Sequence, residues 1–289
     1  MGLGTDHITA ATNAVFIPEL WALDVIEAAE SSLVMADLVT RFDDLAAEGG
    51  SKINVPKISN LLAHSKEAET EVTLNATTED EVEIALSNHK EVSFLIEDIA
   101  QVQARPSLRD LYTRKAGYAI AKAIDSHLLG LYSDLAQSVD ATGELTEDQL
   151  DAKILDAMNY LDLADSPNED RFMIIHPSAK KKLLAVDKFV QMTYRSGDEA
   201  NAPVTTGLFG ELYGMQVFCS SNVPTAVVEQ QTIYQNTVFQ RGAFALAIQL
   251  GPRAQANYIP QYLGWLVTID VIYGFAKLRD MFAVNFKTD

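Results

Sequence analysis

The sequence predicts an α+β fold in which strands and one long helix occupy different parts of the chain. Apolar and polar residues alternate in runs within residues 51–96, which is the two-residue period of half-buried strands. The apolar period changes to 3.6 residues at 107–136, as in a helix, and alternation returns at 265–287. The chain has 289 residues, 48% of them apolar, so a substantial core can be buried around these elements.

Residues 16–42 predict an arm followed by an amphipathic helix. Leu20, Leu23 and Ile26 recur at helical spacing, and Pro18 suits the first turn of a helix. Trp21 falls on a different face, so we expect it to contact something other than the local core. An ordinary amphipathic surface helix is the alternative.

A basic strand and a long acidic stretch come next. In "GGSKINVPKIS", Ile53 and Val55 face one way and Lys52 and Asn54 the other, while Pro56 indicates an edge or an irregular position. Residues 65–96 predict further strand runs at 72–74, 82–86 and 92–96, with a turn between the first two. The acidic residues that gather here are Glu67, Glu69, Glu71, Glu79, Asp80, Glu81 and Glu83. They form either a solvated face or a protection of exposed strand edges against unwanted pairing.

The helical period at 107–136 predicts one continuous α-helix of about thirty residues, roughly 45 Å long. Ser107 suits the N-cap, and an apolar stripe runs from Leu108 to Leu135. We expect Gly117 and Gly130 to weaken this helix without ending it. We expect the stripe to pack on the C-terminal strands, on the residues Val267, Ile269 and Val271.

The second half of the chain predicts a compact unit of strands and shorter helices. Residues 139–148 are interpreted as a polar linker, after which Thr146 caps a helix that ends near Ala164. A buried strand, a break at Pro177 and a short basic helix follow, and then a glycine-led strand at 215–219. After a further strand and a turn, the pattern does not separate helix from strand at 244–250. The last strands, to residue 287, suggest an antiparallel sheet edge.

The sequence predicts no catalytic residue, cofactor site or metal site. The net charge of −18 argues against nucleic-acid binding as a main activity, because that activity needs a basic face. No phosphate-binding glycine motif occurs, and no two of the five histidines have metal-ligand spacing. His176, after a buried strand, and the single cysteine, Cys219, are more simply a turn residue and a small buried side chain. No apolar run approaches the roughly twenty residues of a membrane span.

The order of these elements resembles the major capsid proteins of tailed bacteriophages, which have the HK97-type fold. The stretch "SKINVPKIS" with the acidic residues after it resembles the extended loop (E-loop), and "RPSLRDLYTRKAGYAIAKAIDSHLLGLY" resembles the spine helix of the peripheral (P) domain. "RFMIIHPSAKKKLLAVDKF" and "GLFGELYGMQVFCSSNVP" resemble the axial (A) domain, and "VIYGFAKLRDMFAVNFK" resembles the closing P-domain strands. The resemblance covers nearly the whole chain but depends on the order of elements, because no single motif is diagnostic.

The resemblance implies a division of the chain and a set of intersubunit contacts. The expected parts are an N-terminal arm and helix (1–48), the E-loop with the first P-domain strands (49–98), the spine helix (99–145), the A domain (146–254) and closing P-domain strands (255–289). Residues from about 49 to 91 are expected to pack mainly on other subunits, as an E-loop does. The residues expected at subunit boundaries are Trp21, Lys52, Lys57, Glu67, Glu69, Glu71, Glu81 and Glu83, with the lysines meeting acidic residues of a neighbour; a solvated hairpin is the alternative.

The implied function is an icosahedral virion shell that encloses double-stranded DNA without sequence-specific binding. The expected partners are copies of the chain in pentamers and hexamers, a portal, and a separate scaffolding protein, since only about fifty residues precede the E-loop; assembly would take place in the host cytoplasm. The resemblance does not carry over covalent crosslinking, because nothing identifies the partner of a lysine. Two alternatives stay open: an encapsulin-like bacterial compartment shell, and a soluble α+β enzyme with a site near His176 and Cys219.

Overall fold

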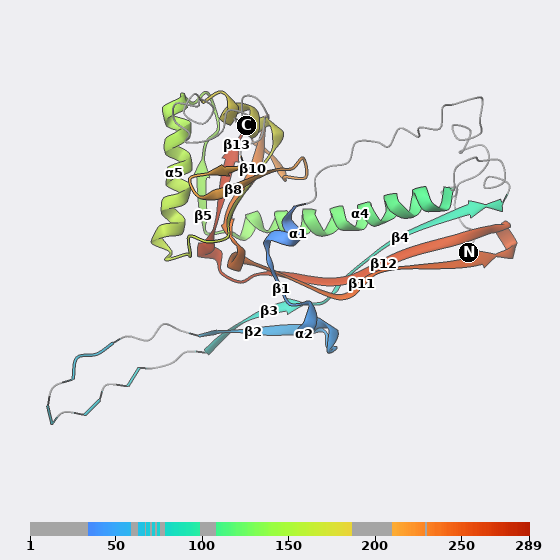
Figure 1. Ribbon diagram of the computed structural model, residues 1–289, viewed down its shortest axis with the longest axis horizontal. Coiled ribbons are helices and arrows are strands. Elements are labelled where there is room, and N and C mark those ends of the chain that lie inside the picture. Colours follow the sequence, from blue (N-terminus) through green and yellow to red (C-terminus); the bar gives the residue numbers. More distant parts are fainter. Residues whose placement is uncertain are drawn as a thin grey trace.

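The computed structural model shows a lobe, a long sheet that leaves the lobe, and a thin hairpin that projects from the region where they meet (Figure 1). The structure describes residues 34–58, 63–66, 68–69, 71–72, 74–75, 79–98, 108–186, 210–228 and 230–289. Within these residues the strands form sheets of four, seven and two strands.

The long sheet has the strand order β1-β11-β12-β4. Its strands are β1 (Thr40–Arg41), β11 (Phe244–Ile259), β12 (Gly264–Lys277) and β4 (Asn88–Glu97). β11 and β12 form an antiparallel ladder that runs from the pair Phe244 and Lys277 to the pair Ile259 and Gly264. This ladder extends well beyond the lobe (Figure 1). The segment at 244–250, which periodicity left undecided, is therefore a strand.

The long helix α4 (Leu108–Gly130) covers one face of this sheet, as predicted. Ile120, Ile124 and Leu128 are buried in the same core cluster as Ile269 and Val271 of β12. The side chains of the first residues of the helix lie outside the described part of the chain. The geometric expectation that a long apolar stripe needs long strands to cover it is confirmed for the described turns of α4.

The predicted C-terminal end of the long helix was wrong. The α-helix stops at Gly130 and continues as one 3₁₀ turn, η2 (Leu131–Asp134), and Leu135 is already extended. The reason is that the chain enters a strand, β5 (Gln137–Asp140), directly afterwards. Leu135 still packs on the core that α4 helps to form. It therefore continues the helical spacing of apolar residues although its own backbone is not helical.

The lobe is built on the seven-stranded sheet, in the order β5-β13-β10-β6-β8-β7 with β9 beside β10. The remaining bounds are β6 (Arg171–Ile175), β7 (Glu211–Leu212), β8 (Met215–Cys219), β9 (Thr225–Val228), β10 (Gln231–Gln240) and β13 (Ala283–Thr288). Helices α5 (Glu147–Leu163) and α6 (Pro177–Leu184) pack on one face, where Ile154, Leu183 and Val284 share a core. A 3₁₀ turn, η5 (Arg241–Ala243), leads from β10 into β11.

Several expectations for the lobe can be compared with this sheet. Thr146 begins α5 with a capping box, in which its hydroxyl and the Gln149 side chain each bond the other residue's backbone, so the predicted cap is confirmed. The predicted linker at 139–148 was wrong in its first part, because β5 pairs in parallel with β13 and buries Val139. The last two strands do not form an antiparallel pair at a sheet edge. β12 lies between β11 and β4, while β13 lies between β5 and β10.

The projecting hairpin consists of β2 (Lys52–Ile58) and β3 (Glu79–Ala85). Its ladder runs from Lys52 opposite Ala85 to Ile58 opposite Glu79. The predicted strand at 72–74 was wrong, since the described residues there are not in a strand and β3 pairs with β2 instead. Before the hairpin, the short helices α1 (Met35–Leu38) and α2 (Asp43–Ala47) flank β1. The rest of the predicted N-terminal helix lies outside the described residues.

Candidate assembly surfaces

The root of the hairpin packs on its own chain, which corrects part of the sequence-based expectation. Ile53 and Ile84 are buried with Ala245 and Ala247 of β11 in a small core that also holds Ala46. Period-two alternation correctly identified the apolar face of β2 but could not find its partner, because β11 lies about 190 residues further along the chain. Only the part beyond this root extends away from the body (Figure 1).

The predicted charged residues of β2 and β3 are exposed, and two of them, Lys52 and Glu83, are already paired with each other. Lys52 Nζ donates to Glu83 Oε2 at 2.9 Å across the ladder, with both side chains about half exposed. This hydrogen bond and the charge of Glu83 raise the pKa of Lys52. Lys57 lies opposite Asp80 in the register, and no ion pair of Lys57 is found within the described residues. The contact of either lysine with a neighbouring subunit stays a prediction.

Three further predicted contact residues lie on β3 and in the described fragments of the segment that connects it to β2. Glu81 is exposed on β3, and Glu69 and Glu71 are exposed in the described fragments of the connecting segment. Glu69 has a left-handed backbone, with φ of 64°. Trp21 and Glu67 lie outside the described residues, so their predicted contacts are not placed by the structure.

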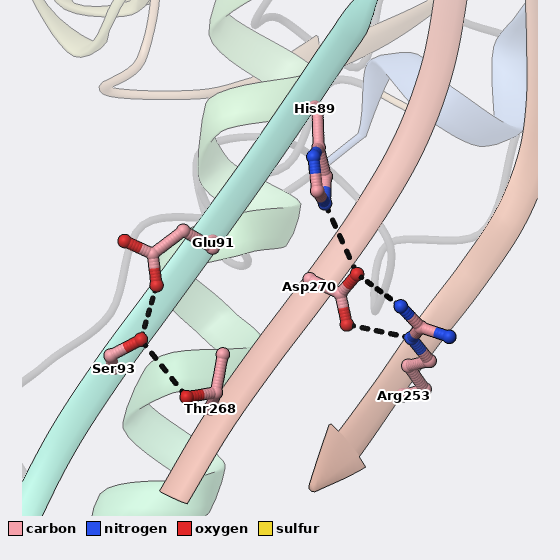
Figure 2. Close-up of polar contacts among 6 residues, drawn as sticks. All are labelled: His89, Glu91, Ser93, Arg253, Thr268 and Asp270. Carbon is pink, nitrogen blue, oxygen red and sulfur yellow. Dashed lines mark hydrogen bonds and ion pairs between the residues drawn. The ribbon is translucent and has the colours of Figure 1, made fainter.

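A polar network lies on the face of the long sheet opposite to α4. Alternation along β12 turns Ile269 and Val271 toward the helix and Asp270 away from it. Figure 2 shows Asp270 between Arg253 of β11 and His89 of β4. Arg253 Nε and Nη2 donate to the two carboxylate oxygens at 2.8 and 3.0 Å, and His89 Nε2 lies 3.1 Å from Oδ2. These hydrogen bonds, from Arg253 first, lower the pKa of Asp270 to about 2.

The network continues along the same face. Ser93 of β4 donates to Glu91 and lies 3.1 Å from the Thr268 hydroxyl of β12 (Figure 2). Glu91 is directly opposite Asp270 in the register, an arrangement of like charges that is unfavourable by itself. Arg253 and His89 offset it by surrounding Asp270 with donors. This face therefore presents polar groups that are held in place and mostly hydrogen-bonded. Its residues come from three strands far apart in the chain, so no sequence pattern indicates them.

The end of the β11–β12 ladder that is farthest from the lobe has large apolar side chains exposed to solvent. Trp265 and Tyr258 are each 40% exposed and meet edge to face with ring centroids 5.4 Å apart. The Tyr258 hydroxyl donates to Asp98 at 2.9 Å, which fixes its ring, and Leu263 beside them is 63% exposed. Aromatic side chains in such positions are typical of protein contacts. The sequence predicts a strand that starts at Trp265, but no sequence pattern indicates how far that strand extends from the core.

His176 and Cys219, the candidates for an enzymatic site, have structural surroundings. His176 caps α6 by accepting a hydrogen bond from the Ser178 backbone, and its ring stacks on Tyr234 with centroids 3.8 Å apart. Burial lowers the pKa of His176 and raises that of Cys219, which is the opposite of an activated thiol. Among the residues that the structure describes, no three His, Cys, Asp or Glu side chains are grouped to hold a metal ion. None of the described helices is long and apolar enough to cross a membrane.

Comparison with known families decides between the possibilities left open by the sequence. The model of the phage capsid protein family matches residues 92–281, which include α4, every strand of the lobe except β13, and both β11 and β12 of the long sheet. The chain belongs to the phage capsid protein family. It is therefore a structural protein of the virion shell, one that assembles with copies of itself. A search of curated proteins found no match.

Solved structures from several phages share the fold of the capsid protein. A structure from Mycobacterium phage Che8 has 24% identity and a TM-score of 0.76, and the match covers 94% of this chain and 97% of that one. The capsid structure of Cyanophage P-SCSP1u has 17% identity and a TM-score of 0.77, with coverage of 100% and 97%. The mature capsid of bacteriophage PhiM1 has 13% identity, a TM-score of 0.71 and coverage of 94% and 91%. These likenesses show the predicted HK97-type α+β fold, and the encapsulin and enzyme alternatives are not favoured.

Proposed function

We propose that the capsid protein forms pentamers and hexamers that close into an icosahedral shell around double-stranded DNA. The observation that carries this proposal is the shape of the subunit. The β2–β3 hairpin beyond its root and the far end of the β11–β12 ladder both extend beyond the lobe (Figure 1), and Tyr258, Leu263 and Trp265 at that far end stay exposed. Extended elements of this kind suit a shell in which each subunit overlaps several neighbours, and many weak contacts per subunit then give a stable assembly.

The seven-stranded lobe would act as the axial domain, and the long sheet with α4 as the peripheral domain. The hairpin would be the extended loop that lies on a neighbouring subunit beyond its root at Ile53 and Ile84. A separate scaffolding protein and a portal are the proposed partners during assembly in the host cytoplasm. The net charge of −18 supports an enclosing role rather than tight DNA binding, because the surface repels phosphate at long range. A catalytic role is not part of this proposal.

Electron microscopy of particles from cells that express the chain, with and without its phage's scaffolding protein, tests the proposal. Closed shells with fivefold and sixfold clusters of subunits are the expected result. Compact monomers under all these conditions, with the described fold intact, would contradict it.

The charged hairpin residues can be tested in the same system. Lys52→Glu/Lys57→Glu should reduce shell yield while the free subunit stays folded. Individual exposed pairs contribute only about 0–1 kcal/mol, so the loss must come from repetition around the shell. Because Lys52 is paired with Glu83 of its own chain, Lys57→Glu alone is the cleaner variant and Lys52→Glu alone its matched control. Normal assembly of the double variant at low and moderate salt would show that both lysines are solvated and make no contact that assembly requires.

A further inference from the structure

One buried carboxylate, that of Asp125 in α4, binds two parts of the chain that lie far apart in the sequence. Asp125 is 1% exposed. Its Oδ1 atom accepts hydrogen bonds from the backbone N–H groups of Val34 at 3.2 Å and Met35 at 2.7 Å. Its Oδ2 atom accepts one at 3.1 Å from Asn222 Nδ2, in the loop between β8 and β9 of the lobe. Among the described residues, neutral donors alone therefore hold this carboxylate.

On one side, Asp125 takes the place of a missing helix cap. The helix α1 has four residues, and its N-cap residue Val34 forms no side-chain cap hydrogen bond. The first N–H groups of a helix have no partner within the helix, and valine is a poor capping residue. Asp125 supplies the acceptor from α4, on which α1 packs (Figure 1). Residues 1–33 precede Val34 in the chain, so Asp125 fixes the point at which this N-terminal segment joins the body.

On the other side, a series of hydrogen bonds connects Asp125 to the centre of the lobe. The Ser220 N–H donates to the Ile175 carbonyl at the end of β6 at 3.0 Å. The Asn222 N–H donates to the Ser220 hydroxyl at 3.2 Å. Val223, the next residue, is 3% exposed in the core cluster that α4 helps to form. The position of the Asn222 side chain therefore follows that of β6, a central strand of the lobe sheet.

The two contacts of Asp125 are linked because both oxygens belong to one planar carboxylate. A displacement of Asn222 that turns this group also moves the acceptor of Val34 and Met35. Burial strengthens the link, since removing a donor from a buried charge costs more free energy than removing one in water. Such a coupling is reciprocal, so a change at the N-terminal segment also acts on the lobe.

We propose that Asp125 is a positioning residue that couples the entry of the N-terminal segment to the position of the lobe. In a shell, the segment and the lobe of one subunit would then adapt together to a pentamer or to a hexamer, two environments that one chain has to fit. That consequence rests on the proposed function, whereas the coupling itself is measured in free subunits.

An exchange of the two side chains tests the coupling. Hydrogen–deuterium exchange with mass spectrometry follows one peptide that contains residues 34–38 and one that contains residues 220–224. Asn222→Asp places a second carboxylate against that of Asp125, and mildly alkaline pH prevents a shared proton from relieving the repulsion. We expect both peptides to exchange at least about tenfold faster than in the parent. Asp125→Asn/Asn222→Asp restores a donor and acceptor pair, with the amide now on α4, and should return both peptides to the parent rate.

Two further variants complete the set. Ser221→Ala changes an exposed residue of the same loop and is the matched control, which should leave both peptides at the parent rate. Asn222→Ala removes the donor without adding a charge, and should also speed the exchange of both peptides. It takes over the test if circular dichroism shows that Asn222→Asp does not fold. Shell yield should fall for Asn222→Asp and recover for the exchanged pair.

Faster exchange of the 220–224 peptide alone, with the 34–38 peptide at the parent rate, would overturn the inference. A defect of Asn222→Asp that the added Asp125→Asn does not relieve would overturn it as well, because the new carboxylate would then act elsewhere. Normal shell yield from Asn222→Asp despite faster exchange would contradict the role in assembly. If the parent forms no shells but the two peptides respond together, the proposed function fails and the coupling stands. If shells form but the peptides respond independently, the coupling alone fails.

Discussion

Gly274 of β12 should tolerate no side chain, because it is where the projecting hairpin meets the long sheet. A Cβ at this position would lie 2.5 Å from the Ala85 carbonyl oxygen and 3.0 Å from the Ala85 carbonyl carbon. Both are backbone atoms at the end of β3, so they cannot move away as a flexible side chain would. Gly274→Ala should therefore displace the root of the hairpin and disturb the small core around Ile84.

The expected loss is that of an overpacked site, about 1–3 kcal/mol in the free energy of unfolding of the subunit. Gly117→Ala is the matched control, because Gly117 lies within α4 and an added Cβ would meet nothing within 4 Å. Alanine in the interior of a helix is more favourable than glycine by roughly 0.5–1 kcal/mol. The same chemical change should therefore destabilise the subunit at Gly274 and stabilise it at Gly117.

Urea denaturation of free subunits, followed by circular dichroism, measures both changes. The midpoint should fall for Gly274→Ala and rise for Gly117→Ala, with equal slopes. Shell yield should also fall for Gly274→Ala, since the hairpin would leave the root at a changed angle. An unchanged midpoint for Gly274→Ala would show that the hairpin root is not held against β12 as the structure has it.

Three further predictions concern the core, the polar network and the arm. Leu128→Ala should cost about 2–5 kcal/mol of subunit stability in the same urea assay, because Leu128 is 1% exposed where α4 meets the sheet. The pKa of Asp270 is about 2 in the folded chain and 3.8 ordinarily, so its contribution to stability is present above pH 4 and is lost as the pH falls through about 2. Asp270→Asn should flatten the stability-versus-pH profile between those values; an unchanged acid profile would contradict this. Trp21→Ala should lower shell yield more than subunit melting temperature, and equal losses, or a loss of folding alone, would place Trp21 in the subunit's own core.

The elements that could be predicted from the sequence are those whose determinants are local. The cap at Thr146, the buried strand before Pro177 and the apolar stripe of α4 depend on residues within one or two turns of each other. The end of α4 could not be predicted in this way, because Leu135 is apolar for packing reasons and keeps the helical period after the helix has ended. Apolar spacing reports which side chains face the core, and it does not report the backbone that carries them.

The surfaces that sequence reasoning missed depend on strand neighbours far apart in the chain. The separation of β12 and β13 into different sheets follows from the pairing of β13 with β5 and β10, which no local pattern reveals. The Asp270 network joins strands near residues 89, 253 and 270. The exposure of Trp265 depends on how far β11 and β12 extend from the lobe. Such surfaces become visible only once the register is known.

The charge of the hairpin restricts how neighbouring subunits can use it. Between Lys52 and Ala85 the chain has three lysines and seven acidic residues, a formal charge of −4, and the Lys52–Glu83 pair is satisfied within one copy. Two hairpins side by side would therefore bring like net charges together. We expect most of the acidic residues to face a positive surface elsewhere on the neighbour. The exposed Lys122 of α4 is one positive group on the described part of the chain, and a hairpin that crosses a neighbour's body would meet it.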